Sequence, residues 1–97
     1  MEEIKEILLK INKLFRHHGL DERADILMKF YNEASSYQNY DPYFIGKIMS
    51  LYGGMGSFFD IVLTKEGRPL RQENIELSAY TDELYEKCIE LRTSRKL

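Results

Sequence analysis

A glycine-rich segment joined directly to an apolar run, residues 51–63 (LYGGMGSFFDIVL), most constrains how this chain can fold. It holds three of the six glycines and lies between two stretches whose apolar residues recur with helical spacing. Glycine ends helices in the left-handed conformation more readily than any other residue. The segment is therefore predicted to be a joint between helices, in which Gly53 or Gly54 ends the preceding helix.

The first part of the chain predicts two helices. Apolar residues at three- and four-residue spacing indicate a helix over residues 2–18, ended by Gly19. A second helix is predicted to start at an Asp21 N-cap. Its buried face would contain five residues: Ala24, Leu27, Phe30, Tyr31 and Ala34. Because the connection between the two helices is short, we expect an antiparallel helical hairpin.

The central part begins with a strong helix start, because Asp41 can cap a helix whose first residue is Pro42. We expect this third helix over residues 42–51, burying Ile45, Ile48, Met49 and Tyr52. Gly46 inside the helix would allow a neighbouring element to approach closely. Ser57 and Asp60 have the spacing of a capping-box variant, which favours a short helix over residues 58–63.

The alternative for residues 58–63 is a buried strand, because FFDIVL is rich in β-branched and aromatic residues. A β-hairpin through Glu66-Gly67 is disfavoured, since Pro69 would lie in the partner strand. Residues 64–72 are instead expected to form a loop.

A long last helix is predicted over residues 73–94. Its buried face would contain Leu77, Tyr80 or Thr81, Leu84, Cys88 and Leu91, widened by Ile75, Tyr85 and Ile89. The predicted fold class is all-α: one domain over residues 1–97, a small bundle of four to five helices with a helical hairpin at the N-terminus and a long C-terminal helix.

Composition and charge exclude several classes of function. The net charge is −2, and basic residues do not cluster as a nucleic-acid-binding domain requires. No apolar run approaches the roughly 18 residues that span a membrane, and the opening MEEIKE lacks the basic start and apolar core of a signal peptide. We expect a cytoplasmic protein that binds neither nucleic acid nor membrane. The lone cysteine, Cys88, excludes an internal disulfide.

No set of residues predicts catalysis, a metal site or a cofactor. His17 and His18 are adjacent in a helix and point about 100° apart, so they cannot ligate one metal ion together in the usual helical arrangement. Cys88 lies on the apolar face of the last helix, as a small buried hydrophobic residue does. Asp60 would be a carboxylate base without a partner. We therefore expect a protein that is not an enzyme.

Two features indicate protein–protein interaction, with a protein partner or by self-association. Tyr37, Tyr40 and Tyr43 surround the connection between the second and third helices, and tyrosine is common at interfaces. The last helix carries an excess of acidic residues that could attract a basic partner. Alternatively, backbone amides in the glycine turn could bind a small anion or a nucleotide. The candidate binding residues are these tyrosines together with Gly53, Gly54, Met55, Gly56, Ser57 and Asp60.

At YGGMGSFFDIVL the chain resembles a family of small bacterial proteins without an assigned activity, which share a GGMGSF-N-D-apolar signature followed by a C-terminal helix. The likeness covers Gly53 to Phe58 and Asp60, then the apolar run to Leu63, and extends more loosely to Leu77 and Glu86. Phe59 stands where the signature has asparagine. Small families of this kind include immunity proteins that neutralise bacterial toxins, so the resemblance implies that function as one possibility.

Overall fold

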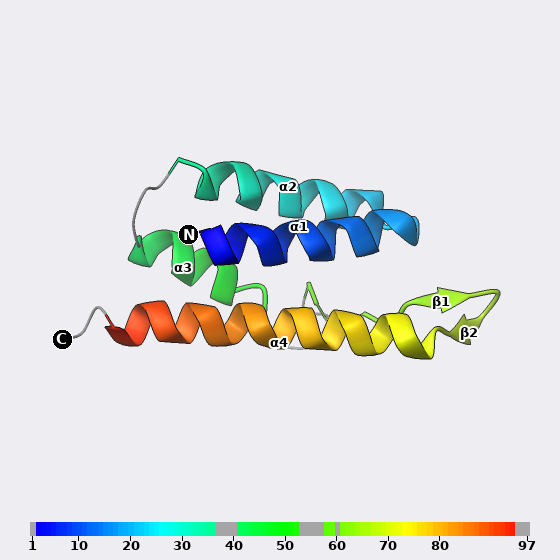
Figure 1. Cartoon of the computed structure of the whole chain (residues 1–97). Coiled ribbons are helices and arrows are strands. Elements are labelled where there is room, and N and C mark those ends of the chain that lie inside the picture. Colours follow the sequence, from blue (N-terminus) through cyan, green and yellow to red (C-terminus); the bar gives the residue numbers. More distant parts are fainter. Residues whose placement is uncertain (1, 37–40, 53–57, 60, 95–97) are drawn as a thin grey trace.

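The structure is a computed structural model that describes residues 2–36, 41–52, 58–59 and 61–94. The described part contains four helices, α1 (Glu2–His17), α2 (Asp21–Ala34), α3 (Pro42–Met49) and α4 (Arg71–Ser94), and a small β-hairpin of β1 (Thr64–Lys65) and β2 (Arg68–Pro69). Helix α4 runs along one side of the molecule, α1 and α2 form the other side, and the β-hairpin projects beyond the start of α4 (Figure 1). The mostly helical fold and the N-terminal helical hairpin are confirmed, and the β-hairpin departs from the predicted all-α class.

Helix α1 forms because its apolar residues fall on one face, and that face supplies much of the core. Ile4, Ile7, Leu8, Ile11 and Phe15 are all buried. The helix ends in a Schellman motif: the amide of Leu20 donates to Phe15 O over 2.9 Å, and the amide of Gly19 donates to Arg16 O over 3.2 Å. Gly19 has φ +78°, so the predicted glycine end is confirmed.

Polar contacts set the position of α2 against α1. The buried Asn12 donates through Nδ2 to Ala24 O over 2.6 Å, and Arg16 forms an ion pair with Asp25 at 2.7 Å. Asp21 is the first helical residue rather than the N-cap, a position that Leu20 occupies. The prediction of an Asp21 cap was therefore wrong by one residue, because the Schellman motif makes Leu20 part of both helix boundaries.

Helix α3 starts as its sequence predicts. The carboxylate of Asp41 accepts a hydrogen bond from the amide of Phe44 over 2.9 Å, with Pro42 in the first turn. The helix buries Ile45 and Ile48, as expected, together with Phe44. Gly46 is exposed, and a Cβ added there would meet no atom within 4 Å, so the prediction of a close neighbour was wrong.

The short helix expected over residues 58–63 is not present in the described residues of that range. Phe58 and Phe59 lie in a turn, and residues 61–63 belong to neither a helix nor a strand. The buried Leu63 is instead held by the side chain of Asn74. Asn74 Oδ1 accepts from the amide of Leu63 over 2.7 Å, and Nδ2 donates to Leu63 O over 3.0 Å and to Leu70 O over 2.8 Å.

The β-hairpin that the sequence disfavoured does form. Its turn places Glu66 at φ +54° and Gly67 at φ +78°, the two positive angles of a type I′ turn. Lys65 pairs with Arg68 and Thr64 pairs with Pro69, and the amide of Leu70 donates to Leu63 O over 2.9 Å. Pro69 therefore falls at a non-hydrogen-bonded pair, where a strand residue needs no amide hydrogen. The rule against proline in strands does not apply at that position.

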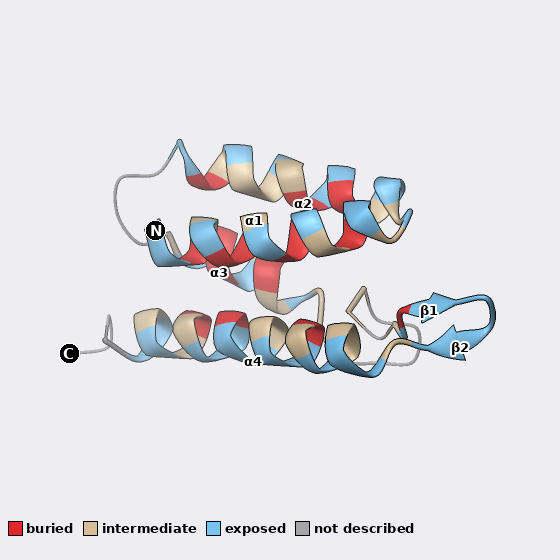
Figure 2. Ribbon diagram, turned by 45° about the vertical axis from the view of Figure 1, so that its right-hand side comes forward, coloured by how far each residue is buried: buried red, intermediate tan, exposed pale blue. Residues whose placement is uncertain are grey.

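Helix α4 closes the core against α1 and α3 (Figure 2). Its buried residues are Leu77, Leu84 and Cys88. Ile75 is 53% exposed and Tyr85 is 41% exposed, so the prediction that they widen the buried face was wrong. No helix in the described part of the chain is long and apolar enough to cross a membrane.

Candidate functional site

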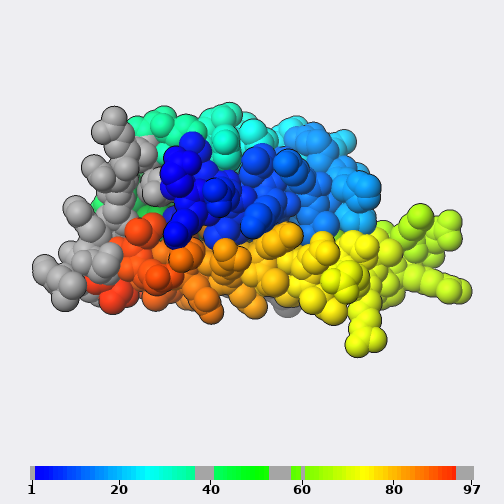
Figure 3. Space-filling model, viewed as in Figure 1, coloured from blue at the N-terminus to red at the C-terminus, as the bar shows by residue number. Residues whose placement is uncertain are grey.

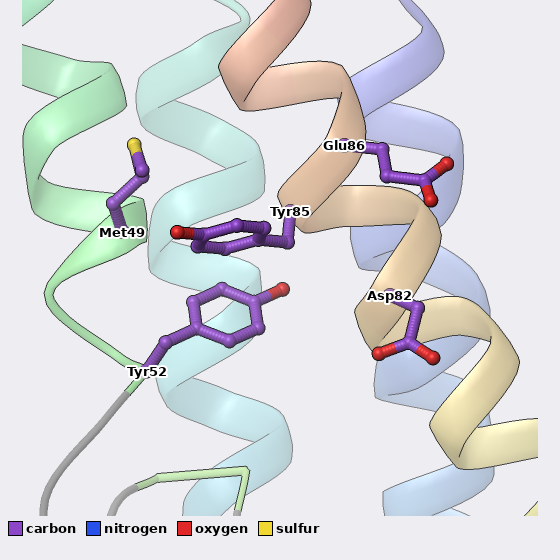
Figure 4. Close-up of a pocket in the computed structure, with 5 residues that line it drawn as sticks. All are labelled: Met49, Tyr52, Asp82, Tyr85 and Glu86. Carbon is purple, nitrogen blue, oxygen red and sulfur yellow. The ribbon is translucent and has the colours of Figure 1, made fainter.

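A shallow groove between α3 and α4 is the strongest candidate site. It has a volume of about 580 Å³ and is lined by five residues: Met49, Tyr52, Asp82, Tyr85 and Glu86. Met49 is the last residue of α3. Tyr52 comes shortly after the end of that helix, directly before the glycine-rich segment. The other three residues come from α4. Figure 4 shows the rings of Tyr52 and Tyr85 side by side, with Met49 next to them.

The aromatic part of the groove continues into the core as a chain of ring contacts. The centroid of Tyr52 lies 5.1 Å from that of Tyr85 and 4.9 Å from that of Phe59. Phe59 contacts Phe58 at 5.1 Å, and Phe58 contacts the buried Phe15 of α1 at 6.1 Å. Aromatic pairs in such tilted and edge-to-face geometries are favourable. The rings thus give the groove a rigid floor anchored in the core.

A hydrogen bond fixes the orientation of Tyr52. Its hydroxyl donates to Thr81 O of α4 over 2.7 Å. Burial raises the pKa of this hydroxyl well above its ordinary value, so Tyr52 stays protonated and keeps its donor at physiological pH. Tyr52 therefore serves as a structural bridge between α3 and α4.

The segment that leaves the glycine turn is held by a cation. Arg23 of α2 donates through Nη1 to Phe58 O over 3.0 Å, and its guanidinium lies 5.4 Å from the centroid of the Phe58 ring. Both contacts fix Phe58, the first described residue after the glycine-rich segment. Tyr52 is therefore bonded to α4 and Phe58 to α2.

The outer rim of the groove is acidic. Asp82 and Glu86 are exposed and lie four residues apart, so their side chains occupy neighbouring positions on one face of α4. In Figure 4 the Glu86 carboxylate points away from the tyrosine rings, on the outer side of the helix. No ion pair within the described residues neutralises either carboxylate. The groove thus combines an aromatic floor with an acidic rim, a combination that suits a cationic side chain.

Tyr43 is the one sequence-predicted site residue that the structure describes, and it does not line this groove. Tyr43 is 75% exposed on α3, with its ring 5.8 Å from Nζ of Lys47. The remaining candidates lie outside the described residues: Tyr37, Tyr40, Gly53, Gly54, Met55, Gly56, Ser57 and Asp60. Sequence reasoning proposed the acidic residues of the last helix but assigned Tyr52 and Tyr85 to the core. Asp82 and Glu86 are four residues apart, about one helical turn, with Tyr85 between them in the sequence. This spacing was the signal that could have identified the groove.

One other candidate for chemistry, Cys88, is explained by packing. Cys88 is buried, and burial raises the pKa of its thiol to about 11, so it is a neutral side chain at physiological pH. The prediction of a small buried hydrophobic residue is confirmed. The rings of His17 and His18 contact each other at 5.0 Å. Among the described residues, no three His, Cys, Asp or Glu side chains are arranged to hold a metal ion.

Comparison with known proteins gives a family but no function. No curated protein and no solved structure matches the chain. A family model described as a domain of unknown function (DUF6966) matches residues 16–71, from the end of α1 to the first residue of α4. That range is more than half of the chain and includes the GGMGSF residues, although the signature itself and a bacterial origin stay predictions. The chain therefore belongs to this family, a domain of unknown function.

Proposed function

We propose that the protein is a non-enzymatic interaction domain that binds a basic segment of a protein partner in the groove between α3 and α4. The observation that carries this proposal is a groove lined by the exposed ring of Tyr85 together with two exposed carboxylates, Asp82 and Glu86. A lysine or arginine side chain can lie on the tyrosine ring and reach a carboxylate at the same time. Such a contact contributes about 0.5–2 kcal/mol from the cation–π interaction.

The rigidity of the floor supports the same function. Tyr52 is fixed by its hydrogen bond to Thr81 O and by the rings on both sides, so little side-chain entropy is lost when a partner covers it. Preorganised tyrosines are frequent hot spots of protein interfaces. The exposed carboxylates would chiefly accelerate association with a basic partner and would do so less at high salt.

The state of two described groups, the Cys88 thiol and the Tyr52 hydroxyl, supports the non-enzymatic assignment. The Cys88 thiol is buried and neutral, and the Tyr52 hydroxyl is protonated and bonded to a backbone carbonyl. Neither group is available as a nucleophile or base. For the same protein we propose a cytoplasmic location.

A finer form of the proposal is neutralisation of a bacterial toxin that has a basic surface. It is supported by the acidic groove and by the family resemblance carried by the glycine turn. Co-expression of this chain with the product of a neighbouring gene that arrests growth would test it: restored growth is expected, and unrestored growth would contradict this form. A small-anion or nucleotide module at residues 53–57 is less well supported, because Tyr52 at the start of that turn lies beside two carboxylates.

Binding of defined peptides tests the proposal. Fluorescence anisotropy would compare a labelled Lys/Arg-rich peptide with an Asp/Glu-rich peptide of equal length. We expect binding of the basic peptide only, weakened at least about tenfold in Tyr85→Ala and in Glu86→Gln. Glu22→Gln is the matched control, because Glu22 is exposed on α2 away from the groove. Equal binding by the Glu86 and Glu22 variants would contradict the proposed site.

A further inference from the structure

The β-hairpin is a projecting basic element that lacks an acidic partner within the described residues. Residues 64–69 are all exposed, and Figure 3 shows the β-hairpin projecting beyond the rest of the surface. Lys65 pairs directly with Arg68, which places two like charges on the same side of the β-hairpin. Like charges directly opposite each other destabilise a strand pair. Contact with carboxylates from outside would remove that cost.

The outward face of α4 offers such carboxylates. Ile75, Ala79, Asp82 and Glu86 recur at four- and three-residue spacing, so they lie on one face of the helix, and all four are exposed. Ile75 is 53% exposed, and the neighbouring small side chains of Ser78 and Ala79 would let a second helix approach closely. This face thus has an apolar part at Ile75 and Ala79 and an acidic part at Asp82 and Glu86.

The spacing of these features along α4 fits an antiparallel pair of molecules. Helix α4 rises about 1.5 Å per residue, so the acidic residues lie about 20 Å from Arg71 at the base of the β-hairpin. A two-fold axis near residues 75–79 would place the β-hairpin of each copy against the groove of the other. Both grooves would be filled by one isologous contact, and the assembly would close as a dimer.

We propose that the groove binds the β-hairpin of a second copy of this chain, with Lys65 and Arg68 of one copy against Asp82 and Glu86 of the other. The inference rests on the proposed function, because it takes the groove to be a docking site for cationic side chains. Ile75 would pack near the two-fold axis. An external basic partner would then compete with the second β-hairpin for the same carboxylates.

Sedimentation equilibrium of the full chain tests the dimer. We expect a concentration-dependent mass that approaches twice the 11.5 kDa of one chain and falls as salt rises from about 50 mM to about 500 mM. Arg68→Glu and Glu86→Arg should each raise the dissociation constant at least about tenfold, and the double variant should recover most of the loss. Lys29→Glu, an exposed change on α2, should leave the dimer intact.

Each outcome decides the inference. A monomer at every concentration, or a dimer that the two single reversals do not weaken, would overturn it. Circular dichroism would verify that the single variants are folded, and recovery in the double variant excludes simple unfolding. If a purely monomeric protein still binds the basic peptide, the dimer alone is wrong. If the reversals dissolve a dimer that binds no basic peptide, only the external partner is wrong.

Discussion

Asn74 holds the segment after the glycine turn against α4, and its replacement by alanine tests how that segment is fixed. Its side chain makes three hydrogen bonds, to the amide of Leu63, to Leu63 O and to Leu70 O. One such bond contributes about 1 kcal/mol net, so the loss of all three costs about 3 kcal/mol at most. Because Asn74 is half-buried, water will replace some of the lost hydrogen bonds. We therefore expect the free energy of unfolding to fall by about 2 kcal/mol.

Urea and thermal unfolding followed by circular dichroism measure this loss. A decrease of about 2 kcal/mol corresponds to a melting temperature lower by roughly 10 °C in a domain of this size. Asn32→Ala is the matched control, because Asn32 is exposed on α2, and it accounts for the better helix propensity of alanine. If Asn74→Ala lowered the stability by no more than about 0.5 kcal/mol relative to the control, the assigned hydrogen bonds would be wrong.

Four further substitutions or titrations follow from the same contacts. Tyr52→Phe removes the hydrogen bond to Thr81 O and should cost about 1 kcal/mol in urea unfolding, yet retain binding of the basic peptide because the ring remains; lost binding at unchanged stability would contradict this. The Cys88 thiol should resist a thiol reagent in the native state and react on unfolding. Burial raises the pKa of this thiol from 9.0 to about 11. The stability that the protonated thiol contributes is therefore complete below pH 9 and is lost as the pH rises through about 11. A free energy of unfolding that stays constant over that range would refute the burial. Gly46→Ala should stabilise the protein by about 0.5–1 kcal/mol, since the site is open and helical. Gly67→Ala should destabilise it by about 1 kcal/mol, because Gly67 has φ +78°, and equal melting of these two glycine variants would be inconsistent with the assigned turn.

Local sequence signals predicted the elements whose stability is local. Helix α1 follows from its apolar spacing and from Gly19, and the start of α3 follows from Asp41-Pro42. Each of these signals acts within a few residues along the chain. Periodicity also found α4, although the helix begins at Arg71, two residues earlier than expected.

The region after the glycine turn could not be predicted because a distant side chain organises it. Asn74 bonds to the backbone of Leu63 across eleven positions, which replaces the helix expected over residues 58–63. Pro69 is compatible with the β-hairpin only in the register that the type I′ turn sets. A propensity rule without the register gives the wrong answer there.

Only the acidic part of the candidate site could be predicted. The acidic residues of α4 stand out in the sequence, and a basic partner was inferred from them. The aromatic floor could not be found, because Tyr52 and Tyr85 share helical spacing with core residues and only the packing of α3 against α4 leaves Tyr85 exposed. Helical periodicity identifies a face but not which edge of it a neighbour covers.

The most direct test of the interaction site is a titration of the ¹⁵N-labelled protein with the basic peptide, followed by NMR. We expect the largest amide shift changes on residues of the groove: Met49, Tyr52, Asp82, Tyr85 and Glu86. The acidic peptide should cause no comparable change. Shift changes centred on the exposed face of α2, or none at saturating peptide, would contradict the account.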